Sequence, residues 1–247
     1  KEVADKEKLR VALGFDNSEN KNYDMLWQLI CQYGLGIPLN LLVAGTVNMD
    51  ETTHGFSRKV IDRALSFDFG EFFPNDYNDF FTPTSSNKRL SYPIWSHASK
   101  ADLANTFDVD GTKTVAFLSA ANAVLKNTPF ELAFRALNEL LLAVASSQPQ
   151  DELTLKAVWD DFMMCKVLPR IEGDEDKLVG HSENNILEEL LKVLEQQLAG
   201  AWENGRPDLY REKVEPVGET IMVACRSKKK LNWMNDQLVR GFTSFWP

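Results

Sequence analysis

The residues best suited to chemistry form a polar cluster that directly follows an apolar run. Residues 39–48 are mostly apolar and follow Pro38, a pattern typical of a buried strand in a parallel sheet. Ligands of open α/β sheets bind outside the carboxyl ends of the strands. The amide of Asn48 is therefore predicted to face a phosphate or to orient an attacking water. In the alternative interpretation, Asn48 and Asp50 satisfy a turn.

Two acidic motifs suggest other chemistry, but their surroundings argue against it. Asp50-Glu51 has the order of a Walker B motif, in which Asp holds magnesium and Glu prepares water, yet the residues before it are too polar for a buried strand. Residues 108–112, Asp-Val-Asp-Gly-Thr, have the order of the nucleophile loop of a haloacid-dehalogenase phosphatase. That loop should follow a strongly apolar strand, and residues 104–107 do not form one. Asp-Gly is also a common turn dipeptide.

The remaining residue types indicate no further catalytic or metal site. The sequence contains no Gly-Lys pair, so the P-loop that cradles a triphosphate is absent from this chain. The three histidines, His54, His97 and His181, are far apart, and no catalytic triad follows from their spacing. The three cysteines show no C-x-x-C spacing, so neither a disulfide framework nor a zinc site is predicted.

The charge balance and hydropathy bound the class of protein. The formal net charge is −9, which does not suit a general nucleic-acid-binding protein. The one dense basic run, residues 226–230, is interpreted as a solvated helix start, with DNA contact as the alternative. Unpaired cysteines and the lack of an apolar run of roughly 18 residues favour a cytoplasmic protein without a membrane span.

The elements that must position the polar cluster lie in the first third of the chain. Residues 1–22 are polar with little periodicity and predict a frayed lead-in or a loop. Helical spacing predicts a helix over residues 23–33 and a short one after Ser57, which is the expected N-cap. The strand over residues 39–48 lies between them, and the alternating residues 66–69 predict a second short strand.

The rest of the chain is predicted to be helical after an irregular stretch. Residues 70–112 are rich in Asn, Asp, Pro, Ser and aromatic residues and show weak periodicity. Apolar stripes at helical spacing predict four helices: residues 130–144 with Pro129 at the start, residues 155–165 ending before Pro169, residues 187–198 capped by Ser182, and residues 231–238 ending at Gly241.

These elements predict a mainly α fold with a small α/β part. The α/β part would occupy residues 1–74, an irregular insertion or linker residues 75–112, and a helical lid with a C-terminal helical region residues 113–247.

The segment around Asn48 resembles the McrB-type AAA+ proteins. The resemblance is carried by residues 42–57, Leu-Val-Ala-Gly-Thr-Val-Asn-Met-Asp-Glu-Thr-Thr-His-Gly-Phe-Ser, and by residues 59–64, Lys-Val-Ile-Asp-Arg-Ala. In that family an apolar strand ends in a Thr-x-Asn sensor 1 motif, and a short helix with Asp-Arg-Ala follows. Softer matches lie at residues 130–139, 166–173 and 230–246, which look like the lid helix, the next lid segment and the C-terminal end of these proteins. The implied fold is the C-terminal edge of an AAA+ α/β core followed by a helical lid bundle.

The resemblance implies roles for individual residues in a ring, usually a hexamer, with nucleotide bound between neighbouring subunits. Asn48 would be sensor 1 and would polarise the attacking water. Arg63 would be the arginine finger that reaches the neighbour's nucleotide, with Arg58 as the competing choice. Arg135 would be sensor 2 and would contact phosphate from the lid. The nucleotide would be GTP or ATP with Mg in the full-length protein.

The resemblance also implies what this chain would need from elsewhere. In the family the P-loop and the Walker B motif precede sensor 1, and this chain contains neither. We therefore expect the C-terminal portion of a motor that couples GTP or ATP hydrolysis to DNA restriction or translocation. A McrC-like nuclease would be its partner, and DNA would be reached through the assembly. The isolated chain is expected to bind and hydrolyse no nucleotide. The alternative is a non-catalytic helical interaction module of AAA+ ancestry.

Overall fold

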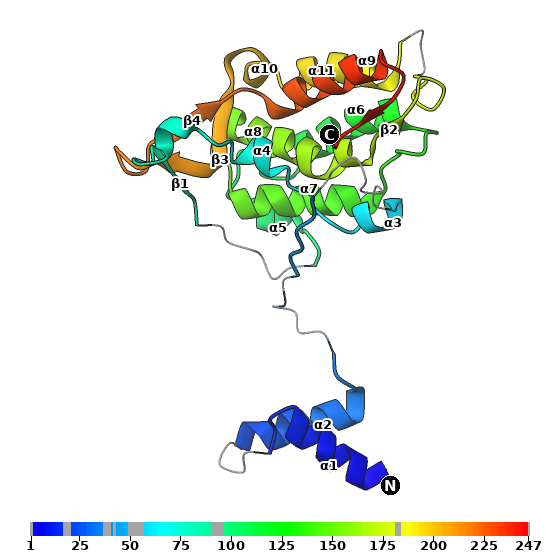
Figure 1. Ribbon diagram of the computed structural model, residues 1–247, viewed down its shortest axis with the longest axis vertical. Helices are drawn as coiled ribbons and strands as arrows, with labels where there is room; N and C mark the ends of the chain where they lie inside the picture. The colour runs from blue at the N-terminus through cyan, green and yellow to red at the C-terminus, as the bar shows by residue number, and fades with distance from the viewer. Residues whose placement is uncertain are drawn as a thin grey trace. The chain divides into compact units, whose positions relative to one another are not determined.

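The computed structural model describes residues 2–16, 21–36, 41, 43–48, 57–89, 96–180 and 184–246. The chain divides into two compact units, Lys1–Thr46 and Val47–Pro247. Over the described residues the protein is mainly helical, with two small antiparallel sheets, as Figure 1 shows. The predicted class, mainly α with a small strand content, is confirmed at this level.

The first unit is a pair of helices, α1 (Glu2–Ala12) and α2 (Lys21–Tyr33). The ring of Phe15 packs edge-on against Tyr23, with the ring centroids 5.6 Å apart, and Trp27 of α2 is buried. Helix α2 confirms the helix predicted over residues 23–33.

Helix α1 shows that the prediction of a frayed lead-in or loop was wrong for this stretch. Its sequence, Glu-Val-Ala-Asp-Lys-Glu-Lys-Leu-Arg-Val-Ala, consists mostly of residues with high intrinsic helix propensity. Summed over three turns, that propensity favours a helix even where no regular apolar stripe marks one, and the periodicity argument alone misses it.

Neither of the two predicted strands is present in the described part of the chain. Residues 41 and 43–48 have no regular secondary structure and are exposed. Residues 66–68 are likewise outside any strand, and Phe69 already begins helix α4 (Phe69–Phe72). A strand persists only where neighbouring strands complete its backbone hydrogen bonds, and no described strand pairs with either segment. The apolar pattern marks a segment able to join a sheet, but it does not supply the partner strand.

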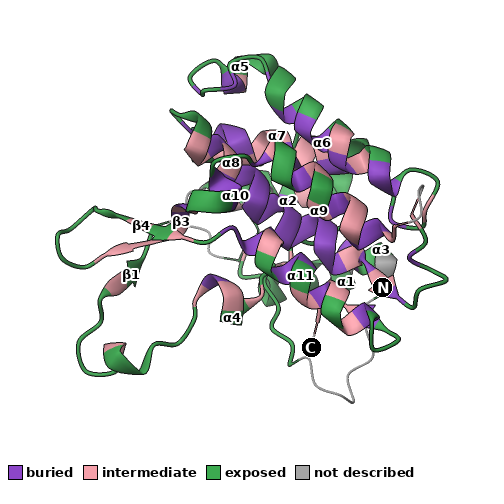
Figure 2. Ribbon diagram, turned by 90° about the horizontal axis from the view of Figure 1, so that it is seen from above, coloured by how far each residue is buried: buried purple, intermediate pink, exposed green. Residues whose placement is uncertain are grey.

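The second unit is organised around helix α8 (Glu152–Phe162), in which every residue from Ala157 to Phe162 is buried. A helix buried on nearly all sides must lie inside the core. In the described part of the chain four other long helices of this unit supply much of the rest of the core, and Figure 2 shows their buried residues in purple. They are α6 (Thr112–Leu125), α7 (Phe134–Ser147), α9 (Ile186–Gln197) and α11 (Arg226–Leu238).

The helix ends differ from the predicted ones by a few residues. Helix α7 begins at Phe134 rather than at Pro129, so Phe130 is buried in the preceding turn and Phe134 is exposed. Helix α8 continues as a π-helical turn, Met163–Val167, and a 3₁₀ turn, Leu168–Arg170, in which Pro169 occupies one of the first two positions. The short turn tolerates proline there because its first amides need no intrahelical partner.

The caps of the other predicted helices are also corrected. The side chain of Asn185 accepts the capping hydrogen bond from Glu188 N at the start of α9, and Ser182 lies outside the described residues. Helix α11 begins at Arg226, five residues before the predicted start, and ends at Leu238. The predicted short helix after Ser57 is present as α3 (Arg58–Ile61).

A small sheet lies beside the helices and was not predicted. Strands β1 (Ser85–Asn87), β3 (Arg206–Lys213) and β4 (Thr220–Val223) pair antiparallel in the order β1-β3-β4. A second pairing joins β2 (Glu172–Gly173) to β5 (Thr243–Ser244). Strand β3 reads Arg-Pro-Asp-Leu-Tyr-Arg-Glu-Lys and lacks apolar alternation, because its buried positions include charged residues. The alternating pattern that predicts a strand is therefore missing from β3.

The stretch predicted to be irregular is only partly so. It contributes β1 to the sheet and holds the short helices η1 (Tyr77–Asp79) and α5 (Lys100–Leu103). Residues 90–95 within it lie outside the described residues. The three predicted domain ranges, 1–74, 75–112 and 113–247, remain predictions.

We predict that Leu140→Ala in α7 lowers the free energy of unfolding by about 2–5 kcal/mol, because it leaves a cavity at a fully buried site. Chemical denaturation measures this change. Phe134→Ala on the same helix is the matched control: Phe134 is 89% exposed, and its loss should change stability by no more than about 0.5 kcal/mol. Equal effects of the two substitutions would contradict the assigned buried face of α7.

Candidate functional site

The three predicted site residues lie at the surface of the second unit. Asn48 is exposed in a segment without regular structure. Arg63 is exposed two residues beyond the end of α3, and Arg135 is exposed in the first turn of α7. The side chain of Arg58 is not among those described, and Asp50, Glu51 and His54 also lie outside the described residues.

The structure brings the Arg63 segment and Arg135 together through Asp62. Arg135 Nη1 donates a long hydrogen bond of 3.4 Å to the backbone carbonyl oxygen of Asp62. The carboxylate of Asp62 forms an ion pair with Arg170, with Nη2 3.1 Å from Oδ1. The guanidinium of Arg63 makes no hydrogen bond or ion pair with any residue that the structure describes, whereas its backbone N–H donates to the carbonyl oxygen of Val60 at 2.9 Å. The carboxylate of Asp62 therefore pairs with Arg170 and not with the neighbouring Arg63.

Lys166 holds the backbone on both sides of Arg63. Its Nζ atom donates to the carbonyl oxygen of Asp62 at 2.9 Å and to that of Ala64 at 3.1 Å. The same nitrogen lies 2.6 Å from Oε2 of Glu139 on α7. Three oxygen atoms therefore surround an ammonium group that has three N–H donors.

Lys166 was not identified as a site residue from the sequence. A signal was nevertheless present, because Lys166 is the one charged residue among residues 162–168, Phe-Met-Met-Cys-Lys-Val-Leu. A lysine in such an apolar stretch is expected to be buried and paired. Its partners could not be inferred, because they lie about a hundred residues away in the sequence.

The chain after Arg63 is also held against the helical part, and we call residues 62–71 the docked segment. The backbone N–H of Ser66 donates to the carbonyl oxygen of Cys165 at 2.9 Å. Further along, the carboxylate of Asp68 accepts from Lys230 Nζ at 3.0 Å. The docked segment is therefore fixed along its length to the π turn and to α11.

The basic run at residues 226–230 corrects an expectation, because it is not a solvated helix start. Arg226 and Lys230 are buried, and Lys229 forms an ion pair with Glu71 of the docked segment at 2.9 Å. The guanidinium of Arg226 also lies over the ring of Phe72, 4.4 Å from its centroid. Two of the four basic side chains are thus buried, and the other two, Lys228 and Lys229, pair with Glu203 and Glu71, so the run offers little free charge to a DNA backbone.

A second polar site, which we call the buried charge cluster, consists of Asp160, Asp161, Arg206, Asp208 and Arg226. Arg206 Nε donates to Asp160 at 2.9 Å, and Arg206 also forms an ion pair with Asp161. Arg226 donates to Asp161 at 2.8 Å and to Asp208 at 3.0 Å. All five residues are buried. The cluster joins α8, β3 and α11 and has no surface for a ligand, so its role is structural.

Asp160 serves a second purpose in this cluster by capping α11. Its carboxylate accepts from the backbone N–H groups of Arg226 and Ser227, both at 2.9 Å. A carboxylate at a helix N-terminus satisfies amides that have no partner within the helix and is favoured by the helix dipole. Burial disfavours the charge of Asp160, but Arg206 and the hydrogen bonds from Ser227 outweigh it and lower the pKa of this carboxyl.

Asp161 behaves in the opposite way to its neighbour. Burial raises the pKa of its carboxyl to about 6, although Arg206 and Arg226 oppose the shift. One reason is visible in the geometry: Asp161 Oδ2 is buried and has no hydrogen-bond partner among the described residues. Adjacent carboxylates in one cluster therefore differ in how readily they ionise.

The loop at residues 108–112 is a helix cap rather than a nucleophile loop. The carboxylate of Asp108 is buried and accepts from Lys113 N at 3.1 Å and Thr114 N at 2.8 Å at the start of α6. Gly111 has φ +77°, and a Cβ there would lie 2.9 Å from Leu103 Cδ1. The Asp-Gly pair thus satisfies local geometry and leaves no carboxylate directed at a substrate.

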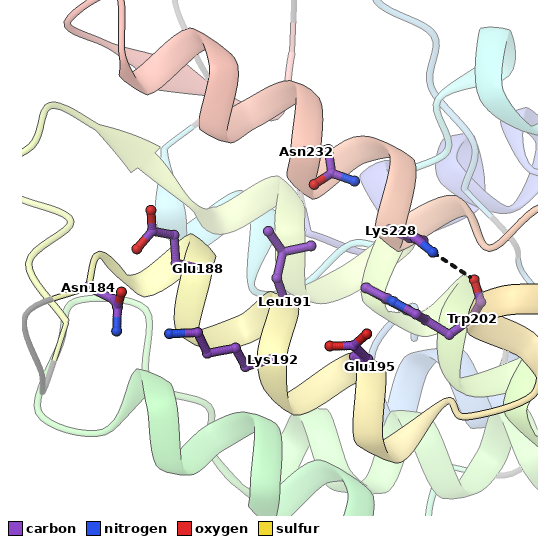
Figure 3. A pocket seen from close by; sticks show the side chains of 8 residues that line it. All are labelled: Asn184, Glu188, Leu191, Lys192, Glu195, Trp202, Lys228 and Asn232. Atoms are coloured by element: carbon purple, nitrogen blue, oxygen red, sulfur yellow. Dashed lines mark hydrogen bonds between the residues drawn. The ribbon is translucent and has the colours of Figure 1, made fainter.

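A groove of about 490 Å³ lies between α9, α10 (Ala201–Asn204) and α11, and Figure 3 shows its lining side chains. Glu188 and Glu195 on α9 and Lys228 on α11 carry charges of both signs around Leu191. Lys228 Nζ donates to the carbonyl oxygen of Trp202 at 3.1 Å. None of Asn48, Arg63 and Arg135 lines this groove, and its mixed charges define no ligand. Nor do the described residues contain a group of three or more His, Cys, Asp or Glu that could hold a metal ion.

The fold defines a mainly helical protein with a small sheet, and its helical part belongs to a recognised family. Residues 95–241, more than half of the chain, match the family described as "Domain of unknown function (DUF8727)", so the chain belongs to this family. The match includes Arg135 and Lys166 but neither Asn48 nor Arg63. No curated protein and no solved structure matches the chain. Among the described residues, no helix has the length and apolar character needed to cross a membrane.

We predict that Asp161 makes the protein less stable as the pH rises from about 4 to 7. The unfolded chain releases the Asp161 proton near pH 3.8, whereas the folded chain releases it near pH 6. The contribution of Asp161 to the free energy of unfolding is therefore fully present below pH 3.8 and is lost as the pH rises through about 6. The loss is on the order of 3 kcal/mol.

Chemical denaturation across this pH range tests the prediction by comparing wild type with Asp161→Asn, which cannot titrate. The stability of wild type relative to Asp161→Asn should fall as the pH rises. Leu140→Ala is the control, because it destabilises the core without removing a titrating group, and its profile should run parallel to that of wild type. A difference between wild type and Asp161→Asn that stays constant or grows with pH would show that folding does not raise the pKa of this carboxyl.

Proposed function

We propose that this chain is the C-terminal portion of a McrB-like AAA+ NTPase, which couples GTP or ATP hydrolysis to DNA restriction or translocation. In this proposal residues 1–74 contain the last part of the AAA+ α/β core, with the sensor 1 segment and the finger helix. Residues 113–247 contain the helical lid. The P-loop and Walker B motif would come from polypeptide outside this chain, because its sequence holds no P-loop.

The observation that carries the proposal is the setting of Arg63. Its guanidinium is exposed and makes no hydrogen bond or ion pair with any described residue, while the carbonyls on both sides of it are held by Lys166. An arginine finger needs this combination, because a fixed backbone must present a free guanidinium to the nucleotide of another subunit. Pairing with Asp62 would have argued against a finger, and the Asp62 carboxylate instead faces Arg170.

The other two residues take the roles that the resemblance implies. Asn48 would be sensor 1, and its exposed amide suits contact with water or phosphate oxygen. Arg135 would be sensor 2, and its bond to Asp62 is long enough to exchange readily for a phosphate. These side chains suit the oxygens of GTP or ATP. In P-loop NTPases Mg²⁺ is held by the P-loop Ser or Thr and a Walker B Asp, so in this proposal the metal would be bound outside this chain.

The proposed assembly is a ring, usually a hexamer in AAA+ proteins, with a McrC-like nuclease as partner in the cytoplasm. DNA would be reached through the assembled ring, because this chain carries a net charge of −9 and the side chains of its basic run pair with acidic residues of the same chain. A second candidate, a non-catalytic interaction module of AAA+ ancestry, is favoured only by the absence of a P-loop from the chain.

We predict that Arg63→Ala in the full-length ring lowers kcat for GTP or ATP hydrolysis by about 10³–10⁵-fold, because the finger stabilises charge in the transition state. Nucleotide affinity and ring assembly should be unchanged, since Arg63 supports neither the fold nor the subunit's own site. Arg58→Ala, five residues earlier, is the matched control and should retain near-normal activity. If Arg58→Ala abolishes hydrolysis and Arg63→Ala does not, Arg58 is the finger. If the wild-type full-length protein hydrolyses neither nucleotide, the interaction module replaces the motor.

We predict that the isolated chain shows no saturable binding of GTP or ATP by calorimetry. Without a P-loop, the remaining contacts are a few exposed side chains, which cannot replace a cradle of backbone N–H groups. Binding with a micromolar Kd would show that the chain holds a complete nucleotide site of its own.

A further inference from the structure

The most unusual group outside the proposed catalytic roles is the ammonium of Lys166. The side chain is 1% exposed, and it lies in the π turn that continues α8. Burying an isolated ammonium is costly, so such a lysine persists only where its partners compensate fully. Turns of π type inside helices also occur frequently at functional sites.

The partners of Lys166 belong to two different parts of the molecule. Glu139, on α7, and Lys166 itself lie in the helical part that matches the recognised family. The two carbonyls that Lys166 binds, those of Asp62 and Ala64, lie in the docked segment, about a hundred residues earlier. The residue between those two carbonyls is Arg63.

We propose that Lys166, paired with Glu139, is a positioning residue that ties the arginine finger to the lid of its own subunit. This inference rests on the proposed function. Two backbone contacts that flank one residue fix that peptide in place, while the side chain between them stays free. Arg135 and Arg170 contact Asp62 but not Ala64. Among the described side chains, only Lys166 therefore bonds to both carbonyls that flank Arg63.

The consequence for a ring is a link between neighbouring nucleotide sites. The lid of one subunit would cover that subunit's own nucleotide, whereas Arg63 would serve the nucleotide of the neighbour. A lid that shifts when its own nucleotide changes would move the docked segment with it through Lys166. A displacement of about 1 Å at a catalytic group can cost about 10²-fold in rate. The state of one site would thereby set the hydrolysis rate at the next.

The test uses the full-length ring and measures steady-state GTP and ATP hydrolysis together with nucleotide Kd. Lys166→Met should lower kcat by about 10²-fold, with Kd and ring assembly unchanged, because the finger is misplaced and not removed. Lys166→Arg should restore most of the rate, since its guanidinium can donate to both carbonyls. Glu139→Gln keeps both backbone bonds of Lys166 and should lower kcat by less than Lys166→Met does. This variant also tests the inference if Lys166→Met fails to fold.

Lys156→Met is the matched control for these variants. Lys156 lies on α8, which the π turn of Lys166 continues. Like Lys166 it pairs with a glutamate, Glu152, and donates to a backbone carbonyl, that of Ala199, but it makes no contact with the docked segment. Its rate should match wild type. Amide hydrogen exchange gives a second, local readout: Lys166→Met should accelerate exchange at Ala64 and Ser66 and leave the core of α8 protected.

The double variant Arg63→Ala with Lys166→Met separates positioning from general damage. If Lys166 acts through Arg63, the double variant should hydrolyse no more slowly than Arg63→Ala alone. A multiplied loss, or equal losses in Lys166→Met and Lys156→Met, overturns the inference. If Arg63→Ala lowers kcat as predicted but Lys166→Met leaves kcat unchanged, this inference is overturned and the proposed function stands. An unchanged rate in Arg63→Ala overturns the proposed function and this inference together.

Discussion

The arrangement of the helical part depends on pairing charges that cannot reach water. Asp160 and Asp161 lie on the central helix α8, where they are buried on all sides. Arg206 and Arg226 must come to them, because an unpaired buried carboxylate or guanidinium would cost several kcal/mol. This requirement places strand β3 against α8 and sets where α11 begins. The small sheet and the C-terminal helix are therefore positioned by electrostatic pairing, and the apolar residues fill the space around it.

The same constraint explains how the docked segment is attached. Residues 62–71 carry little buried apolar surface, and they are held instead by Lys166, Arg170 and Lys230 through carbonyls and carboxylates. Each of these bonds is directional and short in range, so together they define one position for the segment. This manner of attachment leaves the guanidinium of Arg63 without a partner among the described residues, in the middle of a fixed backbone.

Membership of a family whose description names no activity means that function must be argued from the site. The family match covers one side of the contacts made by Lys166, with Arg135, Glu139 and Lys166, but not the other side, with Arg63. The link between the two sides is what the structure adds to the resemblance. It brings two separate sequence motifs, the Asp-Arg-Ala segment and the Lys-Val-Leu-Pro-Arg segment, into contact.

The sequence by itself determined most of the long helices, since their apolar stripes predict α2, α7, α8, α9 and α11 to within about five residues, whereas α1 and α6 were not predicted. It also singled out Asn48, Arg63 and Arg135, whose residue types suit phosphate chemistry. The tertiary structure decided the rest. The predicted strands at residues 39–48 and 66–69 are absent from the described residues, because a strand needs a partner that local pattern cannot supply. Strand β3 and the buried basic run escaped prediction because their charges are neutralised by residues distant in sequence. The partners of Lys166 could not be predicted for the same reason. Periodicity indicates which face of an element is apolar, whereas only folding brings a distant carbonyl or carboxylate to a particular lysine.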